Sequence, residues 1–270
     1  MTSNKMYVYI LAAVGTLGAI PLRIVQNLIM IEPVTGFFRD GYDTANILII
    51  AAVFAIVAVS TLFGRICRDV PQKMPQKTRP FAVVQYALAI SIMFEAFLTE
   101  VSTSTPAWQI IVHIILATLA AVVLFLGGTF TLLRLPERPM MYISLALLWM
   151  MKLIIIFANY TSLSTITENI FELGAICGIL IYFLTWAKLM AGVSTDKVLA
   201  KFLSLSVLSF MLCGIYALPQ LFLLISGNAA LIHSKNVTFI TALVVMVFIG
   251  YYIYLCYKKD RTEERETAEE

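Results

Sequence analysis

The residues from 152 to 172, KLIIIFANYTSLSTITENIFE, decide the fold of this chain. An apolar run ends within this stretch, a polar link follows, and a second apolar run begins with Glu168 and Glu172. Lys152 lies well inside the first run, and the two acids share one helical face because they are four residues apart. Ionisable groups at membrane depth are costly and typically functional. The stretch therefore predicts two membrane helices and a site between them.

The composition places most of the chain in lipid. Hydrophobic residues make up 60% of the chain and charged residues 13%, with a mean hydropathy of +0.90. Soluble domains have about a quarter of their residues charged. The net charge of +3 is small, and its uneven distribution fits a membrane topology better than a nucleic-acid partner. We expect an integral membrane protein whose partner is the lipid bilayer, with no nucleic acid.

Apolar runs of about 20 residues, enough to cross about 30 Å of hydrocarbon, recur along the chain. They predict an all-α fold, a polytopic transmembrane bundle of about eight helices. The expected spans are 6–30, 45–64, 81–100, 108–133, 140–159, 168–190, 202–226 and 237–257. Residues 1–257 then form a single transmembrane domain. The highly charged tail, 258–270, is expected to be cytoplasmic, and disordered or at most a frayed helical extension.

Basic residues indicate the orientation of these spans. The loop 65–79 carries five Lys and Arg residues, whereas the loops on the opposite side carry only Arg39 and Lys235. Short cytoplasmic loops collect Lys and Arg, so we expect both termini in the cytoplasm. Cleavage of the first span as a secretion signal would leave seven crossings and also satisfy this rule. We expect the span to be retained because its polar residues fit with those of later spans.

Polar residues gather in the outer half of the predicted bundle. They are Arg23, Gln26, Asn27, Asn46, Glu95, His113, Lys152, Asn159, Glu168, Glu172, Gln220, Thr238 and Thr241. At about 1.5 Å per residue, several lie roughly 6 to 12 Å below the outer boundary. One interpretation is that each long side chain snorkels to the interface. Glutamate cannot reach as far, so we favour a shared outward-facing polar cavity.

Within that cavity we expect Arg23 or Lys152 to neutralise Glu172 and Glu95, leaving Glu168 nearest water. Glu172 lies one turn deeper than Glu168 and gains less from the helix dipole, so it is expected to be the functional member of the pair. The hypothesis for ligand binding comprises Glu172, Glu168, Lys152, Glu95, Arg23, Gln26, Asn27, His113 and Gln220.

Catalytic and metal motifs do not emerge from the sequence. With two histidines, a triple-histidine zinc site is excluded. His113 with Glu168 and Glu172 would be a candidate metal set, but no supporting spacing is present, and a structural histidine is favoured. The acidic pair also resembles that of undecaprenyl-diphosphate phosphatases, whose serine and arginine loop is lacking. We expect no catalytic residue, no metal and no cofactor.

Proline and glycine mark local features of the helices. Pro21 and Pro219 lie inside predicted spans near the polar layer, where a proline frees a carbonyl and kinks the helix. Such breaks line binding sites in transporters or are ordinary packing kinks. Gly127 and Gly128 are expected to permit close helix packing.

One stretch resembles a known group of proteins. Pro21-Leu22-Arg23, Gln26 and the run IEPVTGFF at 31–38 resemble a segment of an uncharacterised family of multi-pass membrane proteins from Gram-positive anaerobic bacteria. The resemblance implies a bacterial plasma membrane and no particular activity. Phe37, Phe38 and Tyr42 are expected at the headgroup belt or folded over the cavity as a lid.

Together these features favour a binding or transport protein for a small ligand over an enzyme. Polar residues are scarce in the inner half, which favours an outward-facing receptor, a permease subunit that needs a protein partner, or an assembly factor. The alternative is an intramembrane lipid-processing hydrolase or transferase that uses Glu168, Glu172 and His113.

Overall fold

The structure is a computed structural model of the chain. It describes residues 4–32, 39–66, 78–98, 106–133, 135, 142–159, 167–192, 198–228 and 238–269. Within these ranges, side chains are described from Gly15 to Cys256, except those of residues 63–66, 159, 167, 168 and 200.

Eight α-helices and one π-helix account for nearly all of the described residues, and no strand occurs among them. The elements are α1 (Asn4–Val25), η1 (Gln26–Met30), α2 (Asp43–Ile66), α3 (Arg79–Leu98), α4 (Ala107–Leu133), α5 (Ile143–Asn159), α6 (Thr167–Met190), α7 (Val198–Ile225) and α8 (Thr238–Glu269). The prediction of an all-α bundle with eight helices is confirmed. The last helix, α8, continues past its expected end at residue 257. Of the two expectations for the tail, a disordered segment or a helical extension, the structure shows the helical extension.

Within the described ranges, six helices are long and apolar enough to cross a membrane. Their apolar spans are Asp43–Leu62, Arg79–Leu98, Ala107–Leu133, Asn169–Met190, Lys201–Ile225 and Thr238–Cys256, and α5 supplies a shorter apolar helix, Ile143–Ala158. Large apolar side chains such as Ile90, Phe125 and Ile225 are exposed on the outside of the bundle, as lipid contact requires. The chain is therefore a multi-pass membrane helix bundle. Which end faces the cytoplasm stays a prediction.

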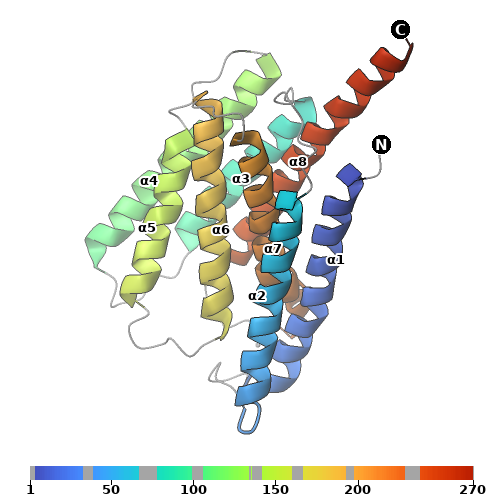
Figure 1. Cartoon of the computed structure of the whole chain (residues 1–270). Coiled ribbons are helices and arrows are strands. Elements are labelled where there is room, and N and C mark those ends of the chain that lie inside the picture. The colour runs from blue at the N-terminus through green and yellow to red at the C-terminus, as the bar shows by residue number, and fades with distance from the viewer. Residues whose placement is uncertain are drawn as a thin grey trace.

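One helix, α7, lies at the centre of the bundle and packs against α1, α2, α6 and α8. The remaining helices form a second group, in which α3 packs against α4 and α8, and α5 packs between α4 and α6. Both chain ends lie toward the same end of the bundle (Figure 1), as an even number of crossings requires. We call this the terminal end, and the opposite end, where α1 ends and α6 begins, the polar end.

Aromatic rings fill the half of the bundle toward the terminal end. The Trp186 ring centroid lies 4.7 Å from that of Tyr142, 5.0 Å from Phe248 and 5.8 Å from Tyr252. These four side chains are almost fully buried. Large rigid rings bury much apolar area at little entropic cost, so this cluster fills the core of the bundle at this level with closely packed rings.

The glycine pair in α4 allows a close approach to α3. A Cβ added at Gly128 would lie 2.7 Å from the Tyr86 Cε1 atom, and one at Gly127 would lie 3.1 Å from Gln85 Nε2. A side chain at Gly128 would force Tyr86 to shift, and one at Gly127 would need its neighbours to give by a few tenths of an ångström. The close packing predicted for these glycines is therefore confirmed. Two hydrogen bonds join the same helices, Thr131 Oγ1 to Gln85 Oε1 (3.2 Å) and one between the Tyr86 and Thr129 hydroxyls (3.1 Å).

Candidate functional site

Four charged side chains are buried within the described part of the chain: Arg23, Glu95, Lys152 and Glu172. Their exposed fractions are 0%, 5%, 8% and 3%, respectively. They come from α1, α3, α5 and α6, and each lies within about two helical turns of the polar end. Because these groups point into the protein rather than along its surface, the snorkelling interpretation is wrong for Arg23 and Lys152.

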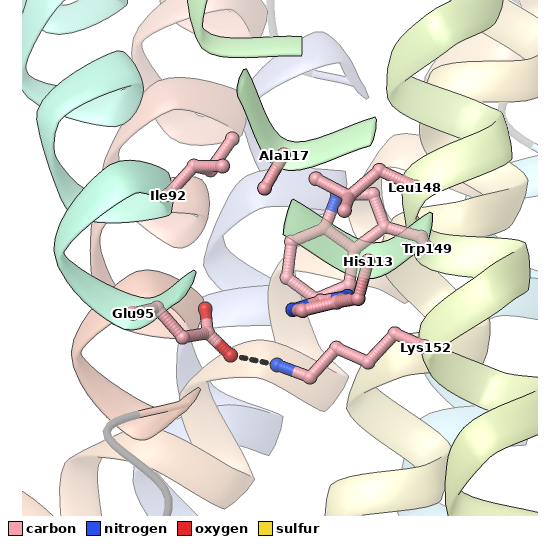
Figure 2. A pocket seen from close by; sticks show the side chains of 7 residues that line it. All are labelled: Ile92, Glu95, His113, Ala117, Leu148, Trp149 and Lys152. Atoms are coloured by element: carbon pink, nitrogen blue, oxygen red, sulfur yellow. Dashed lines mark hydrogen bonds and ion pairs between the residues drawn. The ribbon is translucent and has the colours of Figure 1, made fainter. Parts of the chain in front are cut away.

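Lys152 is the centre of one polar group. Its ammonium forms an ion pair with the Glu95 carboxylate (Figure 2) and donates a hydrogen bond to Thr238 Oγ1, at 3.0 Å. The same ammonium lies 5.0 Å from the centroid of the Trp149 ring, within cation–π range. Glu172 on α6 adds a second electrostatic attraction to Lys152. The ammonium of Lys152 on α5 therefore contacts α3 and α8 and is attracted electrostatically by Glu172 on α6.

A small cavity opens beside the ion pair. Its lining comprises Ile92, Glu95, His113, Ala117, Leu148, Trp149 and Lys152. About 10 Å³ is open to the centre of a water-sized molecule, which is about the room one water needs. Figure 2 shows the His113 and Trp149 side chains facing the same space as the Glu95 and Lys152 head groups. His113 Nδ1 and Trp149 Nε1 are buried and form no hydrogen bond with the residues described.

A second polar group lies where α1 ends. Arg23 Nη1 donates a hydrogen bond to Gln26 Oε1, and Gln26 Nε2 donates one to Asn46 Oδ1 at 2.9 Å. The Arg23 guanidinium lies 3.8 Å from the centroid of the Phe171 ring, a distance at which the ring face attracts a cation. Since Phe171 precedes Glu172, α6 contacts both polar groups.

The π-helix η1 positions the second group. Gln26 and Asn27 are consecutive residues of η1, and both are buried. Single π-turns inside helices recur at functional sites because they change the direction of the side chains. Pro21 and Pro219 lie within continuous helices, so the irregular turn appears five residues after Pro21 rather than at it. The sequence signal was the adjacent amides Gln26 and Asn27, but it did not predict the turn type.

The remaining predicted site residues are placed as follows. Gln220 is buried on α7, His113 belongs to the cavity beside Glu95, and Glu168 begins α6 with its side chain outside the described set. Phe37 and Phe38 also lie outside the described residues, so the lid stays a prediction. Tyr42 is exposed next to α2.

Metal and catalytic chemistry gain no support from this arrangement. No group of three His, Cys, Asp or Glu side chains close enough to hold a metal occurs in the described ranges. His113 lines the cavity with Glu95 and Lys152, a set that does not include Glu172. Sequence reasoning had grouped His113 with Glu168 and Glu172, because it could not predict that α4 approaches α3 and α5.

Of the cavity residues that sequence reasoning did not predict, Trp149 is the one that carries a polar side-chain atom. It precedes Lys152 by three residues and so shares its helical face. That spacing was a signal available in the sequence.

Comparison of the chain with protein-family models, with curated proteins and with solved structures gives no match. Its function is therefore argued from the geometry of the two polar groups.

Proposed function

We propose that this chain is a binding or transport-type membrane protein, a permease, permease subunit or receptor, with its ligand site at the polar end of the bundle. One observation carries the proposal: four helices each bury a charged side chain at this end, as Arg23, Glu95, Lys152 and Glu172.

The energetics favour a functional reason for these charges. Each buried ion carries a desolvation penalty of several kcal/mol, and a well-packed apolar replacement of a buried pair is often equally stable or more stable. A helix bundle in lipid needs no such charges to fold, since its helices associate through packing. Charges retained at membrane depth mark pathways for ions or substrates.

The small size of the cavity indicates that the ligand site is closed in this structure. Ligand pockets for small molecules measure about 300 to 1,000 Å³, whereas the space beside Lys152 suits about one water. A solute would enter only after helices at the polar end separate, so the structure corresponds to a closed site. The aromatic cluster around Trp186 blocks passage toward the terminal end. Access from the polar end is therefore the shorter route.

The polar end faces outward in this proposal, because the sequence predicts the basic loops on the opposite side of the membrane. The membrane is proposed to be the bacterial plasma membrane, in line with the resemblance of residues 21–38.

Mass spectrometry of the small molecules that co-purify with the protein tests the proposal. The comparison uses the unaltered protein, Glu172→Gln and Glu32→Gln, each extracted from native membranes in mild detergent. Glu172→Gln removes a buried charge with little change of shape, and Glu32 is an exposed acid near the same end that serves as the control. We expect a solute enriched with the unaltered protein and with Glu32→Gln, and lost from Glu172→Gln at equal folded yield.

The proposal is wrong if Glu172→Gln retains the solute with unchanged affinity. It is equally wrong if none of the three preparations enriches a solute over a detergent-extracted membrane protein of similar size.

A further inference from the structure

The cavity beside the Glu95–Lys152 pair is too small for a solute but suits a water molecule that carries a proton. Its lining combines a carboxylate, an ammonium and an imidazole, with apolar walls from Ile92 and Leu148. Two of its nitrogens, His113 Nδ1 and Trp149 Nε1, form no hydrogen bond with any described residue although both are buried. A buried water typically makes about three hydrogen bonds to such groups. The cavity therefore has the size and polarity of a hydrated proton-transfer site.

Titratable groups from four helices lie at or near this site. Glu95 from α3, His113 from α4 and Lys152 from α5 line the cavity. Glu172 on α6 acts on Lys152 electrostatically, and α8 contributes the hydroxyl of Thr238, which does not titrate in the usual range. The charge of Lys152 therefore stays compensated when Glu95 is neutral, because Glu172 still attracts the ammonium. A pair with only one acid would leave a buried ammonium without compensation on protonation, at a large cost.

We infer that Glu95 is a reversible proton-binding group, and that the proton is the coupling ion of the proposed transport-type protein. A proton delivered through the cavity bonds to a Glu95 carboxylate oxygen and converts COO⁻ to COOH. The Lys152 ammonium keeps its own protons and its charge. Its ion pair with Glu95 is lost, and its interactions with Thr238 and Glu172 remain. The buried charge of the site rises by one unit, and release of the proton restores the pair.

A metal cation is excluded from the same position by charge and by ligand number. The Lys152 ammonium already occupies the place beside the Glu95 carboxylate and repels a second cation. Hard cations such as Ca²⁺ and Mg²⁺ also take about six or more oxygen ligands. The described side chains include no group of three acids, histidines or cysteines for such an ion. A proton needs a single oxygen.

Infrared difference spectroscopy after a pH change tests proton binding without any solute. The full-length protein in nanodiscs is compared between about pH 4 and about pH 9, a range that spans ordinary carboxyl and imidazole titration. The samples are the unaltered protein, Glu95→Gln, the double variant Glu95→Gln/Lys152→Met and the control Glu32→Gln. We expect the unaltered protein and Glu32→Gln to show the C=O stretch of a buried protonated carboxyl on acidification. Glu95→Gln and the double variant lose a single carboxyl from this band.

Absence of the band from the unaltered protein refutes proton binding even if Glu95→Gln folds poorly. The double variant avoids a buried unpaired ammonium and assigns the band to Glu95. Proton binding at Glu95 is refuted if the unaltered protein shows no buried-carboxyl band, or if either folded variant retains the band in full. A band that changes when choline chloride is replaced by sodium chloride at constant pH would assign the site to a metal cation and overturn the inference. The inference rests on the proposed function only for the role of the proton. A carboxyl band without a co-purifying solute would refute transport, and a solute without the band would refute the proton site.

Discussion

Replacing Lys152 with methionine tests whether the buried ion pair holds α3, α5 and α8 together. The methionine side chain is about as long as the lysine side chain and is apolar, like the hydrocarbon stem of lysine. The substitution therefore removes the ammonium and largely keeps the packing. The Glu95 carboxylate, 5% exposed, then loses its ion-pair partner. Thr238 loses the hydrogen bond that Lys152 donates.

The magnitude follows from this loss. Removing one partner of a buried ion pair destabilises a protein by about 3 to 5 kcal/mol, and the lost hydrogen bond adds about 0.6 kcal/mol in a membrane protein. We expect Lys152→Met to lower the free energy of unfolding by about 3 to 5 kcal/mol. The double variant Lys152→Met/Glu95→Gln should recover most of that loss, because the buried Glu95 carboxylate is removed together with its ion-pair partner.

The assay is a titration of the folded protein from a mild into a denaturing detergent, followed by circular dichroism. Lys201→Met removes an exposed lysine on α7 and should change the free energy of unfolding by no more than about 0.5 kcal/mol. A Lys152→Met protein as stable as Lys201→Met would refute the reasoning, since it would mean that the ammonium reaches solvent. A double variant no more stable than the single one would refute the coupling between the two residues.

Three further predictions use the same material. Gly128→Ala should cost about 1 to 3 kcal/mol in the same titration, because its Cβ would lie 2.7 Å from Tyr86 Cε1, whereas Gly18→Ala, with no atom within 4 Å, should be neutral or stabilising. Reporters fused after the last residue and inserted at position 72 should be cytoplasmic, and one inserted at position 103 external, so an external carboxyl terminus would contradict the eight-crossing topology. Glu168→Gln should weaken solute retention less than Glu172→Gln, and an equal or larger loss would contradict the assignment of Glu172 as the functional acid.

The helices could be predicted because lipid imposes a simple rule on the sequence. A membrane span must be apolar over about 20 residues, so hydropathy alone located all eight helices. The burial of Arg23, Glu95, Lys152 and Glu172 was predictable for a related reason, since charges inside apolar runs have to face the protein interior.

The pairing of these charges could not be predicted in full. Sequence reasoning gave Lys152 two candidate acids, Glu95 and Glu172, and the structure uses both, one as an ion pair and one as a second electrostatic partner. The choice depends on which helices are neighbours, and hydropathy contains no information on that. The aromatic cluster around Trp186 was missed for the same reason, because its rings come from α6, α8 and the residue before α5 and meet only in the packed bundle.

The glycine contact between α3 and α4 has a mechanical consequence. Gly127 and Gly128 allow α3 and α4 to pack closely near the terminal end, and the hydrogen bonds of Gln85 and Tyr86 stabilise this contact. Because α3 and α4 are held together at the terminal end, they can separate more easily at the polar end. Glu95 lies nine residues beyond Tyr86, about 14 Å along the helix, so a tilt of about 10° would move it by about 2.5 Å. Such a displacement, about the diameter of a water molecule, would be enough to part Glu95 from Lys152 without moving the aromatic cluster around Trp186.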